Sequence, residues 1–185
     1  MNAPYATSAG RFLDAVSAWL GVCRERTYEG EPAMRLEAAA SSGRPIEIPM
    51  SIEVRGGFRV IDTVSLFLSL IELAKEKSAA DVAASVQAAL AEGTAAAAIA
   101  SAMERGIDTV AFTGGVAYND AIADRIRRKV EAAGLVYITN ERIPCGDGGV
   151  SFGQAIFAGG GWEVLEADRP DATPGDEESD RREKD

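Results

Sequence analysis

Histidine is missing from this 185-residue sequence. Imidazole is the commonest general base and the commonest transition-metal ligand in proteins. This chain alone therefore has no imidazole for either role. A metal ion would therefore have to be held by oxygen or sulfur ligands, or by residues of another chain.

Cysteine is also scarce, because Cys23 and Cys145 are the only two and lie far apart. Two cysteines are too few for a disulfide scaffold, and they do not form a metal-ligand pair. No histidine or neighbouring lysine is present to activate Cys145, which favours a structural thiol over a nucleophile.

Basic stripes and targeting segments are lacking as well. The net charge is −10, with nine acidic and four basic residues in 166–185, so we expect no direct nucleic-acid partner. No basic N-terminal stretch precedes an apolar run, as in a secretory signal. The longest apolar-looking region, residues 82–103, is mostly alanine and is interrupted by Gln87, Glu92 and Gly93. It is a poor membrane span, and we expect a cytoplasmic protein without a membrane partner.

What is present suits one globular domain, or one lobe of a larger protein. The apolar fraction is 46%, which is enough for a core at this length. Residues 166–185 have almost no apolar side chains, and residues 161–185 are expected to form an acidic, disordered tail after a domain over 1–160. Periodicity and turn signals predict helices over residues 8–22, 31–41, 63–77, 80–105, 117–134 and within 146–160, and strands within 46–62, 108–115 and 135–139.

Two adjacent glycines, Gly114 and Gly115, end a predicted strand in VAFTGGVAYND. A strand that ends in bare glycines and feeds a helix brings unpaired N–H groups to the helix N-terminus, which favours an anionic or polar ligand. Asn119 is expected in the first helical turn, where its amide can donate to and accept from a ribose or base. The alternative is a tight turn with Asn119 as a helix cap, and the pattern alone does not choose between them.

Asp147, Asp14 and Gly30 are further candidates. Asp147 lies between glycines in PCGDGGVSFGQA, a position that suits a carboxylate directed at a metal ion and equally suits a helix cap. Asp14 lies in an amphipathic helix beside apolar neighbours, where a carboxylate is unusual unless it has a partner. Gly30 marks a turn into the next helix. A solvated aspartate and a plain turn explain the last two equally well.

Four segments in this order resemble the C-terminal part of the HypF carbamoyltransferases, hydrogenase-maturation enzymes whose catalytic domain is akin to Kae1 and TsaD. The resemblance covers roughly residues 5–160. It implies an α/β, helix-rich fold: a ribonuclease-H-like lobe of the actin-like ATPase superfamily. The chain resembles the second lobe with little of the first, so it is incomplete relative to the two-lobe family. The segments are TSAGRFLDAV, TYEGEPAMRLEA, VAFTGGVAYND and IPCGDGGVSFGQA.

The resemblance assigns roles to the candidates. Asp14 and Gly30 match positions that hold the sugar and base side of a nucleotide, and Asn119 matches an asparagine that touches adenosine, with Gly114 and Gly115 forming the loop beneath it. We expect Asn119→Ala to weaken nucleotide binding and to leave the fold largely intact, because an exposed cap is worth only about 1 kcal/mol.

The resemblance also implies cofactors and partners. Family members form carbamoyl-adenylate from ATP and carbamoyl phosphate and then pass the carbamoyl group to an acceptor, the C-terminal cysteine of HypE in the HypF case. Asp147 matches an aspartate that completes a divalent-metal site beside the phosphates, either Mg²⁺ or a transition metal. The family's other metal ligands are two histidines of the first lobe, so a histidine-bearing lobe or another HypF-like chain is the expected partner.

Two departures keep other functions open. Without histidine, the chain alone is expected to be inactive, or to be a non-catalytic adenine-nucleotide-binding module. Val86 and Gln87 stand where HypF proteins usually have Phe and His, and in this detail the chain is more similar to TsaD, the tRNA threonylcarbamoyl transferase. SAGR and GDGGVSFGQ resemble HypF instead. An actin-like sugar kinase is a more remote alternative.

Overall fold

The computed structural model describes residues 6–160, which form two compact units divided between Gly146 and Asp147. The expected tail, residues 161–185, lies outside the described residues. The elements of the first unit are α1 (Ala9–Trp19), α2 (Glu31–Ala40), β1 (Ile52–Arg55), β2 (Phe58–Ile61), α3 (Thr63–Leu73), α4 (Ala79–Arg105), β3 (Thr109–Phe112), a 3₁₀ turn (Gly115–Tyr118), α5 (Asp120–Ala132) and β4 (Val136–Thr139). The second unit contains a 3₁₀ turn (Asp147–Gly149) and α6 (Val150–Ala158).

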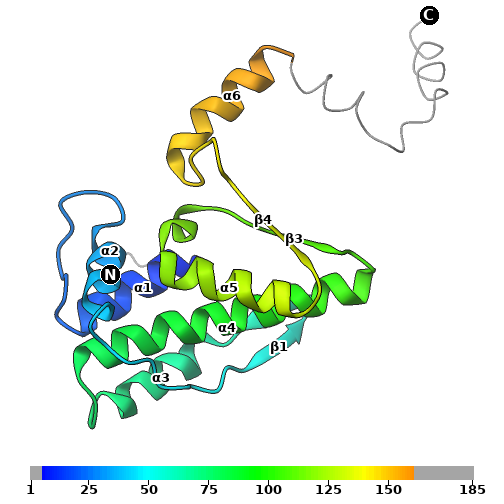
Figure 1. Cartoon of the computed structure of the whole chain (residues 1–185). Coiled ribbons are helices and arrows are strands. Elements are labelled where there is room, and N and C mark those ends of the chain that lie inside the picture. The colour runs from blue at the N-terminus through cyan, green and yellow to red at the C-terminus, as the bar shows by residue number, and fades with distance from the viewer. Residues whose placement is uncertain (1–5, 161–185) are drawn as a thin grey trace, which may run out of the picture. The chain divides into compact units, whose positions relative to one another are not determined.

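Helix α4 is the centre of the first unit and contacts α1, α2, α3, α5 and two strands (Figure 1). The Ser78 hydroxyl caps its start by accepting from the Asp81 N–H, and Gly106 ends it in the left-handed region with φ 66°. Its buried face is built largely from alanines, which let neighbouring helices approach closely because their side chains are short. By length and composition α4 is long and apolar enough to cross a membrane, but 56% of the most apolar 18-residue window is buried in the fold. Its apolar character is therefore explained by its place in the core.

The hairpin β1–β2 is antiparallel, with Ile52 opposite Ile61. Gly56 and Gly57 form its turn with φ 57° and 84°, the left-handed pair that two-residue hairpin turns require. The sequence pattern placed a strand from residue 46, and this is wrong for 46–51, which are not in a strand. Pro45 and Pro49 have no N–H to donate, and the Ile46 N–H instead donates to the Ser85 hydroxyl of α4 at 2.9 Å.

Strands β3 and β4 form a two-stranded parallel sheet with Thr109 opposite Val136. Alternate residues of this sheet, Val110, Phe112 and Tyr137, pack against the core. The other residues include Val136 and Ile138, which are exposed. The described residues are thus α/β and rich in helix, as expected, and within the first unit one apolar face of the sheet is uncovered.

Helix ends differ from the sequence prediction by a few residues. Helix α3 ends at Leu73, four residues early, because the chain closes in a turn in which the Glu76 and Lys77 N–H groups donate to the Leu73 carbonyl. Helix α5 begins at Asp120, because residues 115–118 form the 3₁₀ turn.

Candidate functional site

The loop between β3 and α5 holds three of the predicted residues. Gly114 has φ 96°, a conformation that side chains disfavour. A Cβ atom on Gly114 or Gly115 would meet nothing within 4 Å. The Cβ side of both glycines is therefore open, whereas the Gly114 N–H is already bonded, because it donates to the Cys145 carbonyl at 2.9 Å.

Asn119 is buried and caps α5. Its Oδ1 accepts from the Ile122 N–H at 3.0 Å, and its Nδ2 donates to Gln87 Oε1 of α4 at 2.9 Å. Asn119 therefore does cap α5, and its contact with a nucleotide stays a prediction. The expectation of an exposed cap is wrong, since Asn119 is 8% exposed. It stands before the first turn of α5 and turns its amide inward to α4, so replacing it should also cost stability.

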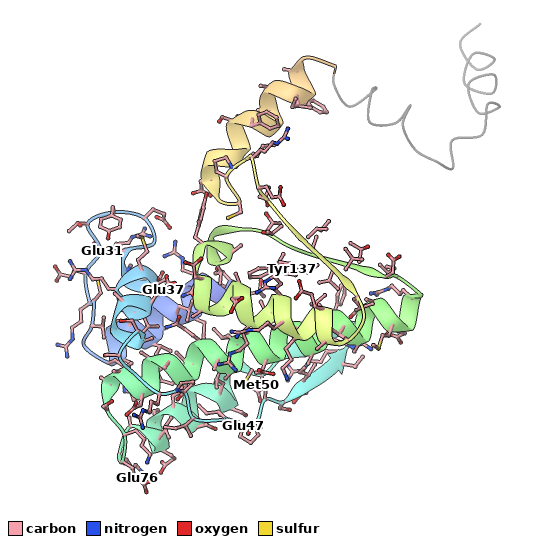
Figure 2. All side chains as sticks on the ribbon, in the orientation of Figure 1. Glu31, Glu37, Glu47, Met50, Glu76 and Tyr137 are labelled. Atoms are coloured by element: carbon pink, nitrogen blue, oxygen red, sulfur yellow. The ribbon has the colours of Figure 1, made fainter. Side chains whose placement is uncertain are left out.

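The N-terminus of α5 is less bare than the sequence suggested. The Asp120 N–H donates to Glu37 Oε1 of α2 at 3.1 Å, and Figure 2 shows Glu37 beside the start of α5. Burial raises the pKa of the Glu37 carboxyl, and the hydrogen bond from Asp120 opposes that shift. Glu37 and Asn119 therefore already occupy two donors at the start of α5.

Asp14 and the loop before Gly30 are linked by Arg11. The Arg11 guanidinium lies 3.3 Å from Asp14 Oδ2 and 3.5 Å from Glu29 Oε1. Gly30 adopts φ 78° at the start of α2, and a Cβ there would meet nothing within 4 Å. The partner that Asp14 was expected to need is Arg11. This makes Arg11 and Glu29 residues of the candidate site that the sequence did not single out.

Glu31 fixes the loop that leads to Gly30. It is 1% exposed, accepts from both the N–H and the hydroxyl of Thr27, and pairs with Arg35 at 2.7 Å. The hydrogen bond from the Thr27 N–H is the main cause of its lowered pKa, helped by the Thr27 hydroxyl, with burial opposing. The sequence signal for this role was a glutamate at the first helical position with an arginine four residues later.

We expect the contribution of Glu31 to stability to depend on pH. Because folding lowers its pKa below the ordinary 4.5, that contribution is complete above this value and is lost as the pH falls through the lowered pKa. Glu31→Gln should therefore be less stable than the wild type at neutral pH and should converge on it in acid. Urea unfolding at a series of pH values measures this, with the exposed Glu29→Gln as a control that should change little. A constant difference at all pH values would contradict it.

The structure brings the two groups of predicted residues onto neighbouring elements. Helix α1 contacts the 3₁₀ turn, and a Cβ at Gly10 would lie 3.8 Å from Val116 Cγ2. Asp14 lies one helical turn after Gly10. The sugar-side candidates and the glycine loop therefore belong to adjoining parts of the first unit.

Asp147 belongs to the second unit, where it opens a 3₁₀ turn and is exposed. The capping alternative is wrong for this residue, because the cap of α6 is Gly149 and no side chain caps that helix. Residues 6–160 contain no group of three or more acidic or cysteine side chains that could hold a metal ion. The described residues therefore do not make a metal site by themselves, and the role of Asp147 stays a prediction that needs ligands from elsewhere.

Comparison with known proteins identifies the family. The family model described as "Carbamoyltransferase, Kae1-like Domain, second subdomain" matches residues 1–154. The chain belongs to the HypF carbamoyltransferase family. The HypF-type domain is 38% identical over 157 residues to a probable carbamoyltransferase HypF of Methanocaldococcus jannaschii, covering 84% of this chain and 20% of that protein.

Two solved HypF structures resemble the HypF-type domain. The crystal structure of T. kodakarensis HypF matches with a TM-score of 0.76 and 40% identity, over 89% of this chain and 21% of that one. A full-length HypF in the phosphate- and nucleotide-bound form matches with a TM-score of 0.75 and 31% identity, over 86% and 21%. A tRNA N6-adenosine threonylcarbamoyltransferase of Prochlorococcus marinus is more distant, at 26% identity over 161 residues, 81% of this chain and 44% of that protein. The chain spans about a fifth of the length of its HypF relatives.

Proposed function

We propose that this HypF-type domain is the nucleotide-binding lobe of a hydrogenase-maturation carbamoyltransferase. In the proposed reaction, water cleaves carbamoyl phosphate to carbamate and phosphate, and a carbamate oxygen then attacks the α-phosphorus of ATP to give carbamoyl-adenylate with loss of pyrophosphate. A protein thiol then attacks the carbamoyl carbon and displaces AMP. The fold it implies is a ribonuclease-H-like lobe of the actin-like ATPase superfamily. The observation that carries the proposal is the free space on the Cβ side of Gly30, Gly114 and Gly115, on adjoining elements of a HypF-type fold.

The adenosine end of the nucleotide has suitable contacts in the first unit. The Asp14 carboxylate can accept hydrogen bonds from ribose hydroxyls. Gly114 and Gly115 have no Cβ, so a flat base or a sugar can approach their main chain. The full-length HypF that matches this domain is in a nucleotide-bound form, which supports ATP as the ligand here.

The phosphate end needs groups that this chain does not supply. No lysine or arginine lies in either glycine-rich loop, at 114–115 or 146–149, and Arg11 is already paired with two carboxylates. Phosphoryl and adenylyl transfer require neutralisation of charge. We therefore assign the phosphate grip and the other metal ligands to a histidine-bearing lobe, with Asp147 as the contribution of this chain.

Within the first unit, one face of β3–β4 is left without cover. Parallel sheets are normally covered on both faces, yet Val136 and Ile138 are exposed on the face that turns away from the core. This face is therefore available for packing by another element. The second partner in this proposal is a HypE-like acceptor protein in the cytoplasm, with no direct nucleic-acid or membrane contact.

A direct test measures ATP binding and AMP release. By titration calorimetry the chain alone should bind ATP, and Asp14→Asn should weaken binding about tenfold or more, because a charged hydrogen-bond acceptor is lost. Asp124→Asn is the matched control: its carboxylate is also paired with an arginine three residues away, on α5. It should bind ATP like the wild type.

The catalytic arm uses the same protein. Carbamoyl-phosphate-dependent release of AMP should be absent for the chain alone and should appear when a HypF polypeptide lacking this region is added. Asp147→Asn should abolish that release while sparing ATP binding. No ATP binding and no AMP release in the mixture would refute the proposal.

A non-catalytic nucleotide-binding module is the second candidate function. Two observations favour it. The sequence has no histidine, and the described residues contain no cluster of acidic or cysteine side chains that could hold a metal ion. ATP binding without AMP release in the mixture would select it.

A further inference from the structure

A chain of buried hydrogen bonds connects α4 to α5. Gln87 Nε2 donates to the Ala83 carbonyl at 3.1 Å, Gln87 Oε1 accepts from Asn119 Nδ2 at 2.9 Å, and Asn119 Oδ1 accepts from the Ile122 N–H at 3.0 Å. Gln87 is 2% exposed. Both amides are thus bonded through their oxygen and their nitrogen within the protein interior.

The backbone groups at its two ends set the direction of this series of hydrogen bonds. The Ala83 carbonyl can only accept and the Ile122 N–H can only donate. Turning the amide of Gln87 or Asn119 over would place two acceptors or two donors face to face, which is costly where water is excluded. The Asn119 amide therefore has one orientation, with one N–H and one lone pair left for another group.

Asn119 also closes the glycine loop through its main chain. Its N–H donates to the Val116 carbonyl at 3.0 Å, and the Ala117 N–H donates to the Gly114 carbonyl at 2.9 Å. A shift of Asn119 would therefore move the loop that contains Gly114 and Gly115, whose Cβ sides are open. The bond to Gln87 ties this loop to the central helix.

We propose that Gln87 is a positioning residue for nucleotide binding, because it fixes the Asn119 amide and, through it, the loop from Gly114 to Tyr118. This inference rests on the proposed function, since it assigns the loop to the nucleotide. Gln87 has no direct contact with the ligand in this proposal. Its effect on ATP passes through Asn119.

Two substitutions separate positioning from bulk stability. Gln87→Met keeps the length of the side chain and leaves the Asn119 N–H without a partner, so ATP binding should weaken about tenfold. The ATP affinity of Gln87→Glu should equal that of the wild type at about pH 6 and fall below it towards about pH 9, with both proteins measured at each pH. The protonated carboxyl can donate to the Ala83 carbonyl and accept from Asn119, whereas the ionised carboxylate faces that carbonyl with a negative charge. Burial raises the pKa of such a glutamate, so the neutral form persists well above the usual range.

Ser85→Ala is the matched control on the same helix. Ser85 is buried, donates to the Asp81 carbonyl and accepts from the Ile46 N–H, so its loss costs stability without touching the Asn119 amide. We expect Ser85→Ala to bind ATP like the wild type. Equal loss of affinity in Ser85→Ala and Gln87→Met would overturn the proposal.

NMR of the Asn119 side-chain amide gives a readout that does not need a ligand. In the wild type one amide proton should be protected from exchange, and Gln87→Met should remove that protection. Protection that persists in Gln87→Met overturns the assignment of orientation, and lost protection with unchanged ATP affinity overturns the link to binding. If the wild type does not bind ATP at all, the proposed function fails and the affinity part fails with it. The NMR result then still decides whether Gln87 orients Asn119.

Discussion

Replacing Gly43 with alanine should destabilise the first unit severely. Gly43 follows α2, and a Cβ there would lie 2.1 Å from the carbonyl oxygen of Ala80 and 2.3 Å from its carbonyl carbon. These are backbone atoms at the start of α4, and the next residue fixes the same place, because the Arg44 N–H donates to Asp81 Oδ1 at 2.8 Å. The helices must therefore separate to admit one methyl group. We expect a loss of about 3 kcal/mol or more in the free energy of unfolding.

Urea and thermal unfolding measure this effect, and Gly10→Ala is the matched control. A Cβ at Gly10 would meet its nearest atom at 3.5 Å, an ordinary contact, and the position is helical. Gly10→Ala should be as stable as the wild type or slightly more stable, because alanine favours helix. Wild-type stability of Gly43→Ala would show that α2 and α4 do not approach each other in this way.

Leu70→Ala should be the second large effect. Leu70 is 0% exposed on α3 and belongs to the core cluster. Truncating it removes apolar contacts and leaves a cavity, which typically costs about 2 to 5 kcal/mol. Leu66 is the other buried side chain of α3, and Phe67 packs against Phe12 and Trp19 of α1, so these apolar contacts hold the helix in place.

Leu68→Ala is the control on the same helix. Leu68 is 59% exposed, so the same truncation there removes little buried surface and should change the free energy of unfolding by less than about 0.5 kcal/mol. Chemical denaturation of both variants gives the comparison. Equal effects of the two substitutions would mean that α3 presents another face to the core.

Local pattern was sufficient for the elements that carry their own signals. Ser8 as a cap of α1, Pro32 in the first turn of α2 and the double glycine of the hairpin mark their elements in the residues themselves. The prediction failed where distant partners decide. Residues 46–51 alternate like a strand, but the first N–H of this segment, that of Ile46, pairs with a side chain of α4 that lies 39 residues further along the chain. The start of α5 was missed because a 3₁₀ turn and a helical turn have similar sequence preferences.

Some residues of the candidate site could likewise be predicted from the sequence, whereas others could not. The glycine pair and Asp14 could be picked out from motif and type, since open backbone and an isolated carboxylate in a helix are visible in the chain. Arg11 and Glu29 could not, because charged residues near a turn are common and their pairing depends on how the loop folds back. Gln87 drew notice only as a departure from the family pattern, and its bond to Asn119 spans 32 residues.

The sequence by itself determined the family, most of the helices and the residues to which the resemblance assigns nucleotide contacts, because these depend on local spacing and residue type. The tertiary structure decided that Asn119 is buried rather than exposed, that side chains already occupy two donors at the start of α5, and that the Asn119 amide donates to Gln87. These features depend on hydrogen-bond partners brought together by the packing of α2, α4 and α5. Such partners are far apart along the chain, so no local pattern encodes them.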